Sequence, residues 1–145
     1  MTDRPARDAF AHLRRVSTRW TDNDVYGHVN NAIYYQFFDS VINSHLIDAG
    51  GLDIHRGEVV AFIVRSECDF FAPVAFPADL EIGLAVAKLG NSSVTYRLGL
   101  FTPGGTTASA LGRMVHVFVA RATHRPAPIP PALRAALEPL VRDLD

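Results

Sequence analysis

Residues 32–49, AIYYQFFDSVINSHLIDA, constrain the fold more than any other part of the chain. The polar residues in this segment form a narrow stripe at helical spacing, made by Gln36, Asp39, Ser40, Asn43 and Ser44. Apolar side chains cover most of the remaining circumference, and a helix on the surface of a globular protein has a narrower apolar face. We therefore expect a long helix wrapped by a sheet. Asn30 or Asn31 is expected to cap it, and Gly50-Gly51 to end it.

Five strand-like runs accompany this helix. One run precedes it at residues 12–20, and four follow it at residues 59–71, 79–89, 92–101 and 109–122. Glycine, proline and asparagine turns separate the later runs, and short links favour antiparallel neighbours. We predict an α+β fold with a long central helix wrapped by a curved five-stranded antiparallel sheet. Residues 1–9 are expected to fray, and residues 130–145 to form a short terminal helix.

Length and charge narrow the class of protein. A chain of 145 residues predicts a single domain spanning residues 1–145. A net charge of -1 argues against a partner nucleic acid held by bulk charge. The apolar runs are short and interrupted by charge, so no segment predicts insertion in a membrane. The first residues lack the apolar region of a signal peptide, and Cys68 is the one cysteine, so we expect a cytoplasmic protein without disulfides.

The loop at residues 21–31, TDNDVYGHVNN, is the densest polar cluster of the sequence, and it leads into the predicted helix. The first backbone N–H groups of a helix are unpaired and carry partial positive charge, so they can hold an oxyanion. A carboxylate a few residues earlier could attack a bound carbonyl carbon or activate water beside it. The structural alternative is that Asp22, Asp24 and Asn30 only make turn and capping hydrogen bonds.

The segment from Arg19 to Ile42, RWTDNDVYGHVNNAIYYQFFDSVI, resembles the loop and helix of the 4-hydroxybenzoyl-CoA thioesterase family of hotdog-fold proteins. Later segments that fit the same family are FIVRSECDFFAPV, GNSSVTYRL and RPAPIP. The resemblance covers nearly the whole chain after the first ten residues. It implies a hotdog fold and an enzyme that hydrolyses an acyl-CoA thioester to a carboxylic acid and free CoA, without a cofactor. The six histidines do not have the spacing of metal ligands, so no metal is expected.

The resemblance also assigns roles to residues. The catalytic carboxylate of the family falls on Asp24, as a nucleophile or as a general base, and the amide that polarises the thioester carbonyl falls near Asn31. His28 either assists Asp24 or holds the start of the helix in place, and we favour the second role. The residues expected to contact substrate beside them are Tyr26, Gly27, Asn30 and Tyr34. Tyr26 stands where plant acyl-carrier-protein thioesterases, which share this motif, have a functional asparagine.

Coenzyme A needs cations for its phosphates. The family match places Arg125 at the nucleotide end of the ligand, with Arg65, Lys88 and Arg113 as alternatives. An exposed edge and outer face of the sheet predict a homo-oligomer, either a dimer or a tetramer. In the family the active site is shared between subunits, so Asp24 of one chain is expected to meet Arg65 and Ser66 of another. Two other functions stay open: a hotdog hydratase or dehydratase, and a non-catalytic protein that binds acyl thioesters.

Overall fold

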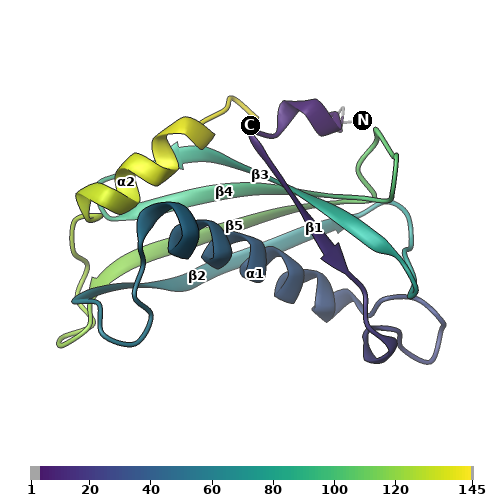
Figure 1. Ribbon diagram of the computed structural model, residues 1–145, viewed down its shortest axis with the longest axis horizontal. Coiled ribbons are helices and arrows are strands. Elements are labelled where there is room, and N and C mark those ends of the chain that lie inside the picture. Colours follow the sequence, from purple (N-terminus) through teal and green to yellow (C-terminus); the bar gives the residue numbers. More distant parts are fainter. Residues whose placement is uncertain (1–3, 145) are drawn as a thin grey trace.

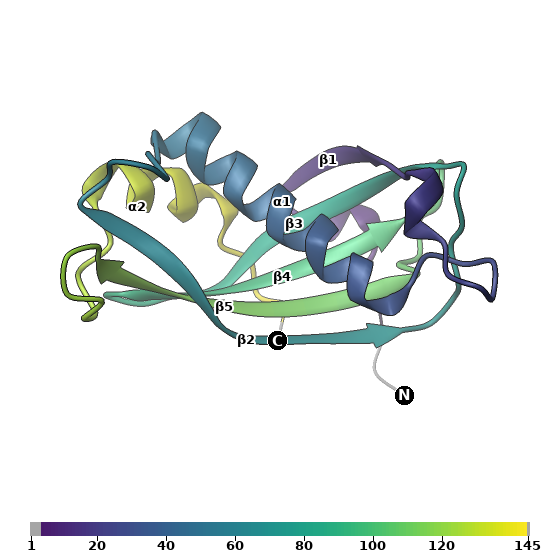
Figure 2. The same cartoon turned by 90° about the horizontal axis from the view of Figure 1, so that it is seen from below.

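The computed structural model describes residues 4–144, and it has the predicted architecture. A five-stranded antiparallel sheet curves around the long helix α1 (Asn31–Gly50), which lies in the concave face (Figure 1, Figure 2). The strands stand in the order β1-β3-β4-β5-β2. Their bounds are β1 His12–Ser17, β2 Val59–Phe70, β3 Asp79–Leu89, β4 Ser93–Phe101 and β5 Ala110–Ala120.

Helix α1 begins and ends where the local sequence predicts. The Asn30 side chain accepts a hydrogen bond from the Ala32 amide, which makes Asn30 the N-cap. Gly51 ends the helix in the left-handed conformation, with φ of 67°. The buried face of the helix packs against inward-facing side chains of the sheet, in a core that includes Phe37, Phe38, Val41, Ile42 and Leu46. Burial of this face holds α1 across the sheet and directs its first residue toward the loop at residues 23–30.

The link between β2 and β3 is not a hairpin, contrary to the expectation that short links join neighbouring strands. Strand β2 pairs with β5 along its whole length, from Val59 opposite Ala120 to Phe70 opposite Ala110, so it forms one edge of the sheet. Strand β3 lies between β1 and β4. This arrangement brings the end of β2 beside the start of α1, where the rings of Phe70 and Tyr34 meet edge to face at 4.9 Å.

The convex face of the sheet is partly covered, although the sequence predicted it to be open. Residues Arg7–Ala9 form a 3-10 helix, and the Phe10 ring then lies over the opposed pair Gly83 and Gly99. A Cβ atom would lie 2.6 Å from this ring at Gly83 and 2.8 Å from it at Gly99. The expected fraying is therefore wrong for the described residues before β1, while residues 1–3 lie outside the described part of the chain.

Most elements are somewhat shorter than predicted, and β5, for example, covers Ala110–Ala120 instead of residues 109–122. Strand β1 ends at Ser17, and a 3-10 helix at Trp20–Asp22 follows it. The terminal helix α2 covers only Pro131–Leu137, and a 3-10 turn at Glu138–Leu140 replaces its continuation. Pro139 lacks the amide that a continued helix would need. Among the helices within residues 4–144, none combines the length and hydropathy that crossing a membrane requires.

Candidate active site

Asp24 lies at the start of a tight turn that leads to α1. Its backbone oxygen accepts a hydrogen bond from the Gly27 amide at 3.0 Å, and its own amide donates to the His28 oxygen at 2.9 Å. Gly27 has φ of 83°, a conformation that side chains other than glycine rarely adopt. The turn therefore needs glycine at this position, and it fixes the backbone of Asp24 against the strand-like segment that enters the helix.

The Asp24 carboxylate is held by two donors and stays partly exposed. Oδ1 accepts from the Tyr26 amide at 2.9 Å, and Oδ2 accepts from Asn30 Nδ2 at 3.2 Å. The first of these is the turn hydrogen bond of the structural alternative. The second is different, because it ties the carboxylate to the N-cap residue of α1. A carboxylate oxygen has more than one acceptor site, so Asp24 keeps capacity for a water molecule or a substrate.

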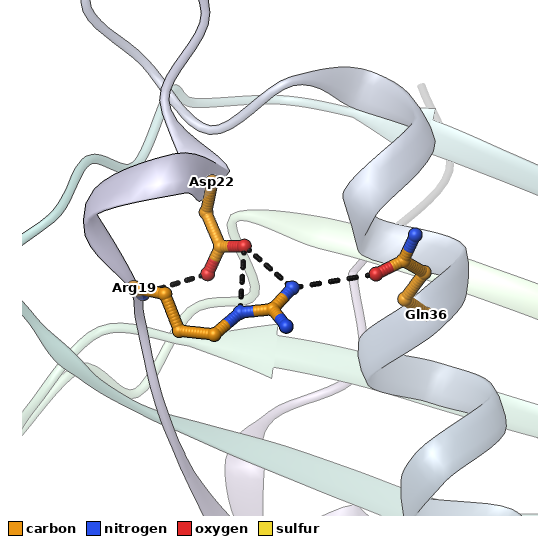
Figure 3. Close-up of polar contacts among 3 residues, drawn as sticks. All are labelled: Arg19, Asp22 and Gln36. Atoms are coloured by element: carbon orange, nitrogen blue, oxygen red, sulfur yellow. Dashed lines mark hydrogen bonds and ion pairs between the residues drawn. The ribbon is translucent and has the colours of Figure 1, made fainter.

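The other aspartate of the loop, Asp22, is 1% exposed and fully engaged by Arg19 (Figure 3). Its Oδ2 accepts from the Arg19 backbone amide at 2.7 Å, and its Oδ1 accepts from Arg19 Nε and Nη2 at 3.0 and 2.8 Å. The hydrogen bond and the charge of Asp22 raise the pKa of Arg19. Asp22 thus has a structural position, and the open carboxylate of the motif is Asp24.

The first turn of α1 borders a cleft of about 280 Å³. His28, Val29, Asn31 and Tyr34 line one side, and the other side is lined by residues 70–73 at the end of β2. The Ala32 amide donates to the Asn30 side-chain oxygen, and the Ile33 amide donates to the Asn30 backbone oxygen. The Asn31 amide has no hydrogen-bond partner within residues 4–144. One N–H group is therefore free beside a cleft of mixed polar and aromatic character.

The predicted residues of the loop occupy different positions around this cleft. His28 and Asn31 line it, and Tyr34 forms its aromatic floor with Phe70. The Tyr26 side chain is 85% exposed and points away from the core, and Gly27 shapes the turn. Neither Asp24 nor Asn30 lines the cleft, but Asp24 is hydrogen-bonded to Asn30, which directly precedes the lining residue Asn31. Phe70 and Phe71 were not predicted as site residues, because only the pairing of β2 with β5 brings them to the helix start.

Arg65, Ser66 and Arg125 do not lie near Asp24 of the same chain. Arg65 and Ser66 are exposed in the middle of β2, where Arg65 Nη2 lies 3.6 Å from Glu67 Oε2. The Arg125 backbone oxygen accepts from Ala120, which is opposite the first residue of β2. Strand β2 has 12 residues, so its ends are roughly 36 Å apart. Arg125 is thus at the end of the sheet opposite to the cleft.

A metal centre and a reactive thiol are two other kinds of site that the described residues could form. Within residues 4–144, no group of three or more His, Cys, Asp and Glu side chains is arranged to hold a metal ion. Burial raises the pKa of the Cys68 thiol, on β2, to about 12. A thiol with so high a pKa is a weak nucleophile at neutral pH. The carboxylate of Asp24 and the amide of Asn31 are therefore the groups best placed for chemistry.

Comparison with known proteins identifies the family of this chain. The model of the thioesterase-like superfamily matches residues 18–137, which include the loop, α1 and all strands after β1. The chain belongs to the thioesterase-like superfamily. The crystal structure of the PA5185 protein from Pseudomonas aeruginosa strain PAO1 is 55% identical to this thioesterase-like chain and has a TM-score of 0.96. The match covers 99% of this chain and 100% of that chain.

Two further relatives are more distant. A thioesterase from Thermus thermophilus, crystallised with coenzyme A and Zn, is 27% identical over 92% of this chain and 96% of that chain, with a TM-score of 0.75. YsmA from Bacillus subtilis strain 168, an uncharacterized protein, is 24% identical over 89 residues, or 61% of this chain and 60% of YsmA. The superfamily and the thioesterase relative support an acyl-thioester hydrolase in general.

Proposed function

We propose that this protein hydrolyses an acyl-CoA thioester to a free carboxylic acid and CoA, as the 4-hydroxybenzoyl-CoA thioesterase family does. The observation that carries the proposal is the pairing of two groups at the start of α1. The Asp24 carboxylate is tied to the N-cap Asn30 at 3.2 Å, and the next residue, Asn31, offers a free amide at the cleft. Membership of the thioesterase-like superfamily and the relative crystallised with coenzyme A support the same substrate class.

The reaction follows from these two groups. The thioester oxygen accepts a hydrogen bond from the Asn31 amide, and the helix dipole adds positive potential as negative charge develops on that oxygen. Asp24 then acts in one of two ways. It attacks the carbonyl carbon, CoA leaves as a thiolate, and water hydrolyses the resulting anhydride, or it takes a proton from water that attacks the same carbon. Both routes end in a carboxylate and the CoA thiol, and neither needs a cofactor.

Other residues of the cleft have supporting roles in this proposal. His28 lines the cleft, and its backbone oxygen accepts from the Asp24 amide, so the loop holds both residues in register. We assign His28 to this structural role first and to proton transfer second. Tyr34 and Phe70 provide an aromatic wall for the acyl group or the pantetheine arm. The loop that meets the substrate is shaped by Tyr26, Gly27 and Asn30, and these residues act on the substrate mainly through that shape.

A second copy of the chain completes the site in this proposal. Strand β2 pairs with β5 on one side, and its other side has no neighbouring strand within residues 4–144. Its exposed apolar side chains include Phe62, Ile63 and Val64. Antiparallel pairing of two such edges about their middle places the first residue of one β2 beside the last residue of the other. Arg125 of the partner subunit would then approach the cleft of this chain and hold the phosphates of CoA. Arg65 and Ser66 would lie at the centre of the interface.

The test measures CoA release with a thiol reagent from short and long acyl-CoA substrates. Asp24→Asn should keep the fold and lower kcat by about 10²–10⁴-fold, the loss expected for a positioned acid, base or nucleophile. Asp53→Asn is the matched control, because Asp53 also accepts turn hydrogen bonds, from His55 and Arg56, at the other end of α1. If the kcat of both variants stays within about threefold of wild type, the role of Asp24 is limited to the hydrogen bonds of the turn.

The same experiment separates the other functions. Addition of water to an unsaturated acyl-CoA without release of CoA would identify a hydratase. Binding of acyl-CoA with neither reaction would identify a non-catalytic binding protein. Release of CoA by the wild-type protein, lost in Asp24→Asn, is the result that supports the thioesterase.

A further inference from the structure

The ion pair between Arg19 and Asp22 is the most fully bonded polar group of the loop, and the reaction described above does not use it. We propose that Arg19 and Asp22 are positioning residues, which set the place of Asp24 and of the Asn31 amide relative to each other. This inference rests on the proposed thioesterase function. Neither residue touches the substrate in this proposal. The pair acts through the backbone and side chain of Asn30, and Arg19 adds a contact with Gln36 of α1.

The geometry of the pair fixes the loop in three places. The Arg19 side chain grips one carboxylate oxygen of Asp22 with two N–H groups, and the Arg19 backbone amide donates to the other oxygen. The Asp22 side chain is entirely buried, while the Arg19 side chain stays 60% exposed. The planar fork of arginine suits this arrangement and a lysine cannot reproduce it, because an ammonium group is a point charge. Figure 3 shows the closed ring of contacts between the two residues.

The pair is connected to the reacting groups by one backbone hydrogen bond. The Asn30 amide donates to the Asp22 backbone oxygen at 2.9 Å. Asn30 in turn donates from Nδ2 to the Asp24 carboxylate and accepts the Ala32 amide on Oδ1. A shift of Asp22 therefore moves Asn30, and through Asn30 it moves both the carboxylate and the first turn of the helix.

Arg19 also reaches α1 directly. Its Nη2 lies 3.4 Å from Gln36 Oε1, on the exposed side of the helix (Figure 3). The same guanidinium thus contacts the loop through Asp22 and the helix through Gln36. Catalysis depends on such registration, since a displacement of about 1 Å can cost about 10²-fold in rate. The pair is built to resist that displacement.

The test compares steady-state kinetics of Asp22→Asn and Arg19→Lys with wild type on one acyl-CoA substrate. We expect kcat to fall by about 10- to 100-fold while KM changes by less than about threefold, because the loop acts on the carbonyl and not on the nucleotide end. Asp48→Asn is the matched control. It breaks another arginine–aspartate pair, Arg14 with Asp48 at 3.1 Å, which joins β1 to α1 away from the loop, and its kcat should equal that of wild type.

A double-mutant cycle separates positioning from general destabilisation. If the pair acts by setting the place of Asp24 relative to the Asn31 amide, its effect should largely disappear once the Asp24 carboxylate is gone. Adding Asp22→Asn or Arg19→Lys to Asp24→Asn should then lower kcat by far less than the same change does in the wild-type background. The inference would be overturned if the fold-reductions in kcat of the single variants multiplied in the double variant. It would also be overturned if Asp22→Asn and Arg19→Lys each had the kcat of wild type. If Asp22→Asn does not fold, Arg19→Lys decides alone, since its side chain is largely exposed. A wild-type protein that releases no CoA would instead refute the proposed function, and this inference would fall with it.

Discussion

His116 is the most deeply buried histidine among the described residues, and it lies in the core rather than near the cleft. It is 2% exposed on β5, and its Nδ1 lies 3.0 Å from the Tyr96 hydroxyl on β4. Burial lowers the pKa of His116 to about 4, from an ordinary value of 6.5. The folded protein therefore keeps this imidazole neutral at pH values where the unfolded chain binds a proton.

This difference predicts how stability depends on pH. Between the folded pKa of about 4 and the unfolded pKa of 6.5, the unfolded state binds more protons. The contribution of His116 is therefore present above pH 6.5 and is lost as the pH falls toward 4. We expect a loss of about 2 kcal/mol of unfolding free energy between about pH 7 and pH 5.

Thermal or urea unfolding of wild type and His116→Gln at both pH values measures this contribution. The variant keeps a polar partner for Tyr96 but cannot titrate, so its stability should fall less on acidification. Asp39, whose pKa is raised by burial, contributes equally to both proteins and cancels in the comparison. Equal acid losses in the two proteins would contradict the prediction.

Which aspartate is open could not be read from the motif alone. Asp22 and Asp24 stand two residues apart in the same polar loop, and both are plausible turn residues by composition. Resemblance to the family predicts Asp24 as the catalytic carboxylate, and in the structure Asp22 is buried and paired with Arg19, while Asp24 is more accessible. Arg19 was missed as a site residue because an arginine at the end of a strand is usually a solvated surface charge.

At the scale of elements, the start of α1 offers a direct test of the oxyanion site. Asn31→Pro removes the free amide, and the first helical turn tolerates proline. Asn30 already has φ of -60° and ψ of 140°, a conformation that suits a residue before proline. We expect kcat to fall by about 10²–10³-fold, the usual loss for one oxyanion donor.

Asn31→Ala is the control, because it keeps the amide and removes only the side chain. Its kcat should stay much closer to that of wild type. Circular dichroism is the check that both variants are folded. Equal losses of activity would mean that the Asn31 side chain, and not its amide, is the functional group.

Elements that depend on local sequence were predicted well. The caps of α1 follow from Asn30 and Gly51, and the turns that join β3 to β4 and β4 to β5 follow from their glycines and prolines. The partner of β2 could not be predicted in the same way, because pairing with β5 is a contact between distant segments. That single long-range choice puts Phe70 at the cleft and Arg125 at the other end of the sheet.

At the scale of the whole molecule, the edge formed by β2 predicts association. It is twice as long as the opposite edge strand, with 12 residues against six in β1. Its apolar side chains include Val64, which is 60% exposed at the point where the pairing with β5 shifts register. A long apolar edge of this kind is normally covered by another chain.

We expect light scattering at micromolar concentration to give at least twice the monomer mass of 15.9 kDa. Val64→Lys should shift the mass toward the monomer and also reduce CoA release, because the proposed sites are shared across this edge. Val141→Lys, at another exposed valine away from β2, should do neither. A wild-type monomer would contradict both the dimer and the shared site.

The ring of Phe10 over Gly83 and Gly99 has a practical consequence for anyone who expresses this protein in pieces. The stretch that matches the superfamily, residues 18–137, leaves out β1, Phe10 and the buried Leu140. A fragment cut at those limits would lack β1, so β3 would become an unpaired edge strand. It would also lack the Phe10 ring that covers Gly83 and Gly99 on the convex face. Such a fragment should aggregate on purification, because an unpaired edge strand can pair with other chains. An expressed form should therefore keep residues 4–144 intact, and an N-terminal affinity tag needs a spacer so that Phe10 can pack against the two glycines.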